Sequence, residues 1–304
     1  MKPLWGIDLG GTKIEGIVLE SSMTTIPLAR LRIPTEQEKG YQHILTRIKH
    51  LVEKMKDETG LKPSTIGFGT PGVLDPRYHT LKNSNTVCLN GKPLKKDLEK
   101  ILGIPVEIAN DANCFTLAET RLGAAEGLIL NNKMVFGVIM GTGVGGGIVF
   151  NNHVWNGSQG IAGEWGHNFL DESGGKCYCG KSGCVETVIS GPGTEKFYQS
   201  LSGSYLQLPD IVDAYKKNND VFAKQTMKRL TDMFAKAISQ VINILDPAVV
   251  IIGGGLSNIG DLYTGGKKNI EKYIFNNTVQ TRFLKPVLGD SAGVFGAAML
   301  TTKS

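Results

Sequence analysis

The chain contains two stretches in which an apolar strand, a glycine-rich turn and a second apolar strand follow one another directly. The first is LWGIDLGGTKIEGIVLE at residues 4–20, and the second is MVFGVIMGTGVGGGIVF at residues 134–150. Short apolar runs bounded by turn signals predict buried strands, and paired glycines are typical of tight hairpin turns. Two halves that open in the same way predict a duplicated α/β fold.

The segments between and after these hairpins also mix strand and helix patterns. Apolar side chains recur at helical spacing over residues 41–56 and in long patterns at about 208–245. Buried strands are predicted at 65–69, 105–109 and 248–255, and a closing helix at 293–302. A length of 304 residues is typical of about two domains.

Composition argues against several classes of protein. Hydrophobic residues make up 41% of the chain and charged residues 20%, as in ordinary globular proteins. The net charge of +5 is scattered, whereas a nucleic-acid-binding protein needs a concentrated basic face. No signal peptide and no apolar run long enough to span a membrane is visible. With an odd number of cysteines, five, these features predict a cytoplasmic protein that binds neither membrane nor nucleic acid.

The turn in the first hairpin is a candidate phosphate site. Gly10 and Gly11 permit positive φ and leave backbone N–H groups free to point at an anion. Thr12 and Lys13 add a hydroxyl donor and a positive charge, and Asp8 could hold a hydrated Mg²⁺. A plain hairpin turn is the alternative interpretation.

Two later glycine loops are further candidates for nucleotide phosphates. GTGVGGG at 141–147 fits the spacing of dinucleotide-binding loops, but a strand follows it where that motif needs a helix, so we reject NAD. A phosphate-binding turn through Gly141, Thr142 and Gly143 remains, with a structural turn as its alternative. In IIGGGLSN, Gly254 and Gly255 follow a buried strand and would let a ligand approach the backbone closely.

The segment EIANDAN places Asn110 and Asp111 at a junction between a strand and a helix. Both residue types favour the N-cap of a helix, which is one interpretation. The other is that Asp111 lies at the carboxyl edge of a sheet, where α/β folds bind ligands, and accepts a proton from a substrate hydroxyl.

Three of the five cysteines fall within eight residues, and a histidine precedes them. His167, Cys177, Cys179 and Cys184 follow the spacing H-x9-C-x-C-x4-C. Four ligands of the Cys₃His type are typical of a closed structural Zn²⁺ site. Unligated loop cysteines are the alternative, and a redox pair is disfavoured because C-x-C is not the usual C-x-x-C arrangement.

The motifs DLGGTK, NDAN, GTGVGGG, GEWGH, CYCGKSGCVE and IIGGGLSN occur in this order along the chain. In that order they resemble the ROK family of sugar kinases and repressors, over essentially the whole length. The fit is nearest to fructokinase- and mannokinase-type members through KNSNTVCLNGKPL and CYCGKSGCVETVISG. Family repressors carry an added DNA-binding segment ahead of the first motif, whereas only seven residues precede Asp8 here.

The resemblance implies an actin-like fold of two α/β domains around a hinged cleft. We expect residues 1–115 and 291–304 to form the smaller domain. Residues 116–290 would form the larger domain, carrying the zinc loop and most of the ATP site. A homodimer is also implied by the resemblance alone.

The resemblance also implies roles for individual residues. Asp111 would be the catalytic base, and Asn110, Glu164, His167 and Glu186 would contact sugar hydroxyls. One ring nitrogen of His167 would bind zinc while the other faces the sugar. The zinc loop would then be a brace that aims these side chains at the substrate.

The expected activity is ATP- and Mg²⁺-dependent phosphorylation of a hexose, at the 6-hydroxyl group. The stretch LKNSNTVCLNG contains Asn83, Ser84 and Asn85, short polar side chains suited to sugar hydroxyls, although the same residues are typical of turns. We rank fructose or mannose first, with Asn85 among the binding residues. N-acetylglucosamine, N-acetylmannosamine or glucose would be the substrate in alternative interpretations, and a non-catalytic sugar sensor is the alternative from another class.

Overall fold

The computed structural model describes residues 2–128 and 132–302. The chain forms two compact units. The first comprises Met1–Asn132, Gly147–Ala162 and Val287–Ser304, and the second comprises Lys133–Gly146 and Gly163–Pro286. The predicted domain boundaries at 115 and 291 therefore differ from the limits of these units, and as a division into hinged domains they stay a prediction.

The first unit is built on a five-stranded sheet of order β3-β2-β1-β4-β7. Its strands are β1 Leu4–Leu9, β2 Lys13–Leu19, β3 Pro27–Pro34, β4 Ile66–Thr70 and β7 Val106–Asn110. The first three strands pair antiparallel, and β4 and β7 then run parallel to β1. The predicted hairpin around Gly10 is thus the start of a mixed sheet with both faces covered.

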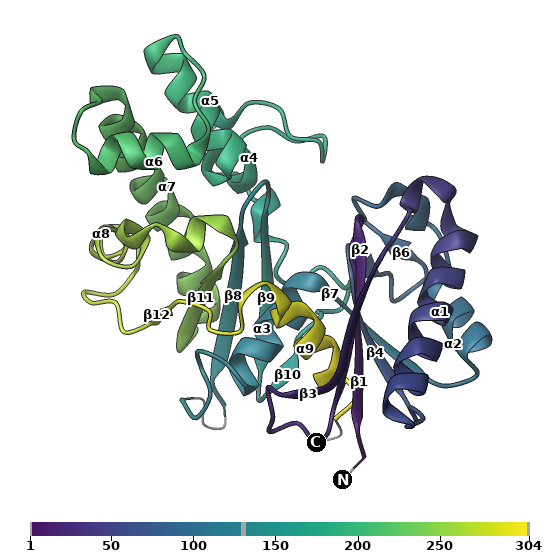
Figure 1. Ribbon diagram of the computed structural model, residues 1–304. Helices are drawn as coiled ribbons and strands as arrows, with labels where there is room; N and C mark the ends of the chain where they lie inside the picture. The colour runs from purple at the N-terminus through teal and green to yellow at the C-terminus, as the bar shows by residue number, and fades with distance from the viewer. Residues whose placement is uncertain (1, 129–131, 303–304) are drawn as a thin grey trace. The chain divides into compact units, whose positions relative to one another are not determined.

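Helices cover the two faces of this sheet (Figure 1). They are α1 Tyr41–Thr59, α2 Leu94–Leu102, α3 Asp111–Arg121 and α9 Ala292–Met299. Figure 1 shows α1 and α2 on one side and α3 and α9 on the other. The apolar stripe of α1, which includes Ile44, Ile48, Leu51 and Met55, is completely buried against the sheet.

Close packing of α9 depends on glycines in the strands and in the helix itself. A β-carbon on Gly67 would overlap the carbonyl oxygen of Ala297, and one on Gly296 would overlap that of Cys114. Without side chains at these positions, backbone atoms of α9 can touch the sheet and α3 directly. The C-terminal helix therefore belongs to the core of the first unit.

The second unit contains most of a second sheet of order β10-β9-β8-β11-β12. Its strands are β8 Met134–Met140, β9 Val144–Phe150, β10 His153–Val154, β11 Val249–Gly253 and β12 Arg282–Leu284. The chain passes from the second unit to the first within β9, between Gly146 and Gly147. β8 lies between its hairpin partner β9 and the parallel strand β11. In the first sheet β1 lies in the same way between β2 and the parallel strand β4.

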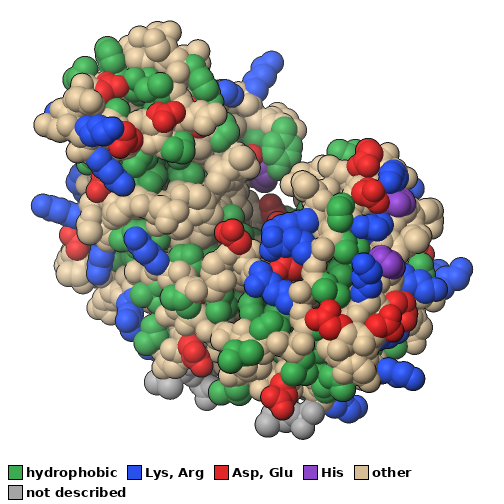
Figure 2. Space-filling view, in the orientation of Figure 1, with side chains coloured by type: hydrophobic (Ala, Val, Ile, Leu, Met, Phe, Trp, Pro, Cys, Tyr) green, Lys and Arg blue, Asp and Glu red, His purple; other side chains and the backbone are tan. Residues whose placement is uncertain are grey.

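The remaining elements are short, apart from one long helix. The helices of the second unit are α4 Val185–Ile189, α5 Gly191–Ser202, α6 Leu208–Lys216, α7 Val221–Leu245 and α8 Gly265–Ile270. A two-stranded sheet in the first unit joins β5 Val73–Leu74 to β6 Leu81–Lys82. In the part of the chain that the structure describes, no helix combines the length and apolar character needed to cross a bilayer. Lysine and arginine side chains are interspersed with acidic ones on the face shown in Figure 2.

Candidate functional site

Three strands of the first unit end at the same edge of its sheet. β1, β4 and β7 are parallel neighbours, with Asp8 opposite Gly69 and Thr70 opposite Asn110. Asp8 therefore lies at the edge where β7 passes into α3, and Asp111 is the first residue of that helix. This is the carboxyl edge of parallel strands, where open α/β sheets bind ligands.

Asp8 is a half-buried carboxylate with a strongly shifted pKa. Burial, followed by the nearby carboxylates of Asp111 and Glu15, raises the pKa of Asp8 to about 7, while Lys13 and Arg32 oppose the shift. Two acidic groups close enough to influence each other suit a divalent cation, because Mg²⁺ prefers carboxylate oxygen ligands. The donor set at this edge thus fits the Mg²⁺ expected beside Asp8.

Asn110 takes the capping role that the sequence offered as one interpretation, and the role of Asp111 as a base stays a prediction. Asn110 is the N-cap of α3, and its Oδ1 accepts a hydrogen bond from the backbone N–H of Asn113 at 2.8 Å. The Asp111 side chain accepts from the N–H of Ala112 at 2.7 Å and remains accessible at the surface. Protein at longer range still desolvates it, which raises the pKa of its carboxyl group against the opposing backbone hydrogen bonds. A carboxylate of this kind is suited to accept a proton.

The glycine turn of the first unit differs from its predicted conformation. Neither Gly10 nor Gly11 has positive φ, and the N–H of Gly10 donates to the carbonyl of Lys13 at 2.9 Å. The expectation of positive φ and of a free Gly10 N–H was wrong. The glycines are needed for space, since a β-carbon on Gly11 would lie 3.3 Å from side-chain oxygens of Gln37 and Thr86.

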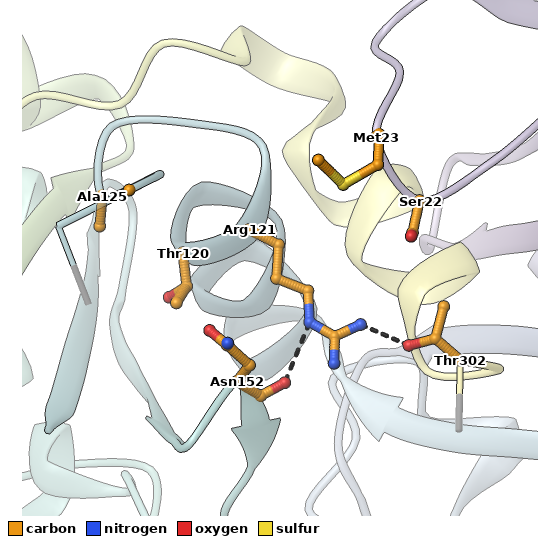
Figure 3. Close-up of a pocket in the computed structure, with 8 residues that line it drawn as sticks. Ser22, Met23, Thr120, Arg121, Ala125, Asn152 and Thr302 are labelled. Carbon is orange, nitrogen blue, oxygen red and sulfur yellow. Dashed lines mark hydrogen bonds between the residues drawn. The ribbon is translucent and has the colours of Figure 1, made fainter. Parts of the chain in front are cut away.

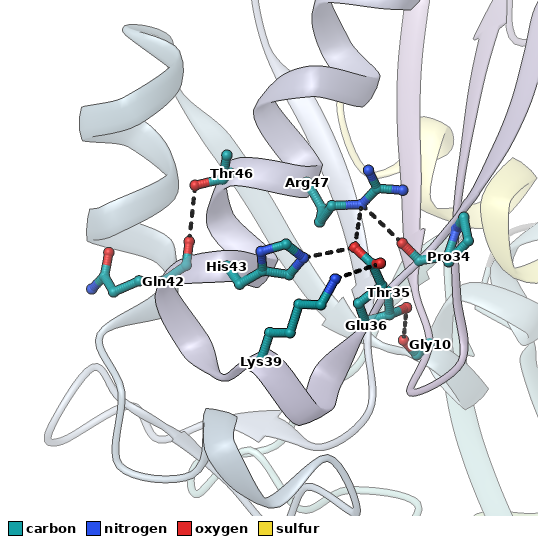
Figure 4. Close-up of polar contacts among 9 residues, drawn as sticks. All are labelled: Gly10, Pro34, Thr35, Glu36, Lys39, Gln42, His43, Thr46 and Arg47. Atoms are coloured by element: carbon teal, nitrogen blue, oxygen red, sulfur yellow. Dashed lines mark hydrogen bonds and ion pairs between the residues drawn. The ribbon is translucent and has the colours of Figure 1, made fainter.

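Thr35 forms hydrogen bonds to the backbone of this turn, and no sequence motif predicted this role. Its hydroxyl donates to the carbonyl of Gly10 at 2.7 Å (Figure 4), and its N–H donates to the carbonyl of Thr12 at 3.0 Å. The Thr35 side chain is completely buried. Because both contacts reach across the turn, Thr35 fixes the backbone around Gly11 and Thr12, the part of the turn that would meet a phosphate.

A cluster of charges holds the residue that follows Thr35. Glu36 has φ of 53°, a left-handed conformation that few non-glycine residues adopt. Its carboxylate contacts Lys39 at 2.8 Å, His43 at 2.7 Å and Arg47 at 3.5 Å (Figure 4). Hydrogen bonds from Lys39 and His43 lower the pKa of Glu36 to about 2. The bend that places Thr35 under the turn is therefore held by several side chains.

The segment 83–91 uses most of its polar side chains for its own fold. Asn83 has φ of 59°, and the Ser84 hydroxyl contacts the backbone of Thr86. Asn90 accepts from the N–H of Ser84 at 2.8 Å and donates to its carbonyl at 2.9 Å. Asn83 and Asn85 are both exposed, and Asn83 serves the loop through its left-handed backbone conformation. The turn interpretation thus applies to Asn83 and Ser84.

The corresponding turn of the second unit is tied to Glu186. The N–H of Gly141 donates to the carbonyl of Gly143 at 2.9 Å, which closes the turn around Thr142. One oxygen of Glu186 accepts from the N–H of Val144 at 2.9 Å, and a β-carbon on Gly143 would lie 2.6 Å from that oxygen. Gly143 is therefore required by the close approach of Glu186.

The third glycine loop begins immediately after β11. Gly254 has φ of 77° and packs against the backbone of Met140, so this position needs glycine on two grounds. Around Gly255 no heavy atom of the described residues lies within 4 Å of the place a β-carbon would occupy. This open backbone would let a ligand approach closely, and phosphate binding at this loop stays a prediction.

The four predicted metal ligands come together in the second unit. The ligand atoms of His167, Cys177, Cys179 and Cys184 all lie within 4.8 Å of one another. Nδ1 of His167 is 3.7 Å from the sulfur of Cys177, and the sulfurs of Cys179 and Cys184 are 3.6 Å apart. Tetrahedral zinc–thiolate geometry requires sulfurs about 3.8 Å apart, so the donor set and its spacing fit Zn²⁺.

The other ring nitrogen of His167 faces Tyr178, a residue to which no sequence motif assigned a role. Nε2 of His167 lies 3.1 Å from the hydroxyl of Tyr178, and the two rings meet edge to face at 5.2 Å. Tyr178 is 82% exposed, and its only hydrogen bond or ring contact among the described residues is the one with His167. Its position between Cys177 and Cys179 was the available signal.

Glu164 precedes the short helical turn Trp165–His167, which a buried tryptophan anchors. The indole N–H of Trp165 donates to the carbonyl of Gly145 at 2.9 Å, and its ring stacks edge-on with Phe136. The anchor links the segment that carries Glu164 and His167 to β9. The residues of the second unit that are expected to bind zinc or sugar thus lie on the zinc loop, on or just before this turn, or on α4.

Known proteins match the chain over nearly its whole length. The model of the ROK family matches residues 4–304. The N-acetyl-D-glucosamine kinase of Vibrio atlanticus (strain LGP32) is 36% identical over 98% of this chain and 99% of its own length. The same enzyme of Histophilus somni (strain 129Pt) is 35% identical over 97% and 98%.

Solved structures also match the fold. The ROK hexokinase from Thermus thermophilus has a TM-score of 0.86 at 28% identity, covering 98% of this chain and 97% of its own. A ROK family glucokinase from Streptomyces griseus, solved with glucose and AMPPNP, has a TM-score of 0.76 at 26% identity and covers 98% of both chains. These matches confirm the predicted duplicated, actin-like α/β fold. The chain belongs to the ROK family.

Proposed function

We propose that this protein transfers the γ-phosphoryl group of ATP to N-acetyl-D-glucosamine. The enzyme class is that of an ATP-dependent sugar kinase, as in its relatives. The observation that supports the acetylated substrate is the 36% identity to N-acetyl-D-glucosamine kinases over 98% of this chain. Asp111, at the carboxyl edge of the first sheet beside Asp8, supports the reaction type.

This proposal reverses the order of substrates inferred from the sequence. Fructose or mannose ranked first because of the polar stretch around Asn83, Ser84 and Asn85. Asn83 and Ser84 shape their own loop, so their presence is weak evidence about substrate hydroxyls. The relatives favour the acetylated sugar that ranked second.

In the proposed mechanism Asp111 acts as general base on the 6-hydroxyl group of the sugar. The carboxylate takes the hydroxyl proton as the oxygen forms a bond to the γ-phosphorus, and the bond to the β-phosphate oxygen breaks to release ADP. A raised pKa suits this role, because a base whose pKa is nearer the working pH holds the proton better. Positioning and charge neutralisation supply most of the catalysis in phosphoryl transfer.

The phosphate-binding groups are proposed from the two glycine turns and the loop after β11. In the first unit these are Gly10, Gly11, Thr12 and Lys13, with Asp8 as the residue that would hold Mg²⁺. In the second unit they are Gly141, Thr142, Gly143, Gly254 and Gly255. Bound Mg²⁺ would neutralise charge on the transferred phosphoryl group.

Sugar contacts are proposed for Asn85, Asn110, Glu164, His167 and Glu186. The side-chain amide N–H₂ of Asn110 is left to a substrate after its oxygen caps α3. Zn²⁺ on Cys177, Cys179, Cys184 and His167 would hold the loop that carries His167 in one conformation. The supporting observation is the convergence of the four ligand atoms. A homodimer and a cytoplasmic location stay predictions.

An assay of ADP release over a panel of sugars tests the function. The panel is N-acetylglucosamine, N-acetylmannosamine, glucose, mannose and fructose. We expect the highest kcat/KM for N-acetylglucosamine, about tenfold above the next sugar, because a site built around the amide loses paired hydrogen bonds with other sugars. A preference for fructose or mannose would reject the proposed substrate, and sugar binding without ADP release would favour a sensor.

A further inference from the structure

A polar cavity lies within the first unit, at the end of α3 remote from Asp111. It has a volume of about 340 Å³, which is the size of a site for a small ligand. α3 runs from Asp111 to Arg121, so the cavity lies roughly 15 Å along the helix axis from the proposed base. It is therefore separate from the catalytic edge of the sheet.

Distant segments of the chain contribute to the walls of this cavity (Figure 3). Ser22 comes from the turn between β2 and β3, and Thr120 and Arg121 come from the end of α3. Asn152 comes from the turn between β9 and β10, and Thr302 follows α9. All of these residues belong to the first unit. A cavity assembled in this way has fixed walls in the folded unit.

Arg121 is the one charged side chain among the residues that line the cavity. Its Nε donates to the backbone carbonyl of Asn152 at 3.0 Å, and Nη1 donates to the hydroxyl of Thr302 (Figure 3). Nη2 has no hydrogen-bond partner among the described residues, and none of their carboxylates forms an ion pair with the guanidinium. Among the described residues, the hydrogen-bond partners of Arg121 are thus all neutral groups.

A partly buried guanidinium whose described partners are all neutral is available to bind an anion, which would add an ion pair to its hydrogen bonds. Burial lowers the pKa of Arg121, which reflects the same desolvation. Arginine offers five N–H donors in a planar fork that matches phosphate oxygens. The hydroxyl of Ser22 has no hydrogen-bond partner in the described part of the chain and adds a neutral donor at the cavity wall.

We propose that this cavity is a binding site for the phosphate group of a small phosphorylated compound or for free phosphate. The ligand would accept hydrogen bonds from Arg121 and Ser22. The volume leaves space for a short organic group beside the phosphate. This inference does not depend on the identity of the sugar substrate.

The decisive variants change charge at the cavity wall with little effect on the fold. Ser22→Asp adds a negative charge in a half-exposed turn, and Ser22→Asn is its neutral match in shape. Both residue types are favoured in turns. Arg121→Gln removes the cation, but it also removes contacts to Asn152 and Thr302, so its unfolding midpoint is measured in parallel.

Binding is measured by calorimetry with inorganic phosphate and with glycerol 3-phosphate at constant ionic strength. The full chain is first saturated with a non-hydrolysable ATP analogue and N-acetylglucosamine, so that phosphate groups cannot enter the catalytic site. We expect Ser22→Asp to weaken binding by about tenfold or more relative to Ser22→Asn, through charge repulsion at short range. Tighter binding of glycerol 3-phosphate would identify a phosphorylated metabolite as the ligand class, and equal binding would identify free phosphate.

The proposal fails if neither anion binds the parent protein. It also fails if both bind equally to the Ser22→Asp and Ser22→Asn variants, because the anion would then lie elsewhere. If the sugar panel identifies another substrate, that sugar replaces N-acetylglucosamine as the blocking ligand, and the comparison of the two Ser22 variants is otherwise unchanged.

Discussion

Thr35 uses both of its backbone and side-chain donors on the glycine turn between β1 and β2. The carbonyl of Gly10, which accepts from the hydroxyl, would lose this partner if the hydroxyl were removed. An unsatisfied buried acceptor costs about 1–3 kcal/mol. The turn would relax to recover that energy, and its remaining N–H groups would move with it.

We expect Thr35→Val to raise the KM for ATP by about three- to tenfold with a smaller effect on the KM for sugar, because small displacements of positioning groups are expensive in catalysis. Thr35→Ser keeps the hydroxyl and serves as the control. Steady-state kinetics with each substrate varied in turn would check this. Equal KM values for ATP in the Val and Ser variants would show that the hydroxyl does not position the turn.

Asp111→Asn keeps the size of the side chain and removes the proposed base. We expect kcat to fall by about 10²–10⁴-fold with little change in binding of either substrate. Glu107→Gln, an equal change of charge at an exposed position on β7, is the matched control and keeps the parental rate. Parental turnover by the Asp111→Asn variant would remove Asp111 from the mechanism.

Individual residues differ in how far the sequence could identify them. Asp8, Asp111 and the metal ligands lie in motifs whose spacing itself carries the chemistry, and the structure brings those four ligands together. Thr35 acts through a contact between strands far apart along the chain, and no local pattern encodes such a contact. The φ angles at Gly10 and Gly11 were mispredicted because glycine is also favoured where space is short, here beside the backbone carbonyl of Lys13 and the side chains of Gln37 and Thr86.

The zinc loop has little regular secondary structure. Between Phe169 and Cys184 the described residues form two isolated bridges, and backbone hydrogen bonds, such as the one from the N–H of Cys177 to the carbonyl of Lys181 at 2.8 Å, close its turns. Tyr178 and Cys179 are exposed at its tip. Metal binding adds to the folding free energy of a loop of this kind.

We therefore expect about one zinc ion per chain in protein purified without chelator. Cys179→Ser should lose most of that zinc and depress kcat/KM, whereas Cys88→Ser, outside the cluster, should retain both. Elemental analysis and the ADP-release assay would measure the two effects. A metal-free parent protein with full activity would contradict the zinc prediction.

Helix and strand types were predictable where the apolar pattern is long, but boundaries between helices were not. The pattern at about 208–245 contains two helices, α6 and α7, separated at Asn218, where φ is 58°. Asp220 caps the second helix by accepting from the N–H groups of Phe222 and Ala223. Apolar spacing continues across this break because both helices bury a face, so periodicity alone merges them.

At the scale of the molecule, Glu15 joins the start of the chain to its end. Its buried carboxylate contacts Arg30 at 2.6 Å and Arg32 at 2.7 Å, and Ser291, just before α9, donates to it at 3.4 Å. Burial alone would raise the pKa of Glu15, but hydrogen bonds from Arg30 and Arg32 lower it overall. The ionised form is therefore favoured in the folded state.

A carboxyl group with a lowered pKa stabilises the folded state at neutral pH and loses that effect as pH falls below its ordinary value of 4.5 and through its folded value. We expect Glu15→Gln to lower the free energy of unfolding by about 1–3 kcal/mol at pH 7, since the arginines are partly solvent-exposed. Denaturant unfolding from pH 3 to pH 7 would show the difference narrowing at acid pH. Glu20→Gln, an exposed neighbour, should show no such convergence. A constant difference across that range would contradict the assignment.

The composition of each compact unit was only partly predictable. The first unit contains the closing helix and also Gly147–Ala162, a segment that the sequence did not assign to it. That segment packs closely against α3, since a β-carbon on Gly147 would lie 2.6 Å from the hydroxyl of Thr116. Long-range packing of this kind depends on the three-dimensional fold and leaves no periodic pattern.

The packing of α9 against glycines of the first sheet has a consequence for the synthesis of the chain. A ribosome releases β1, β4 and α3 early, but it delivers α9 only after residues 133–286 have been synthesised. Until then, one face of the first sheet lacks α9, and Gly6 and Gly67 lack their contacts with the backbone of that helix. Contacts between residues so distant in sequence form slowly. A first sheet that forms before α9 is synthesised therefore leaves the area that α9 covers exposed to solvent until the chain is nearly complete.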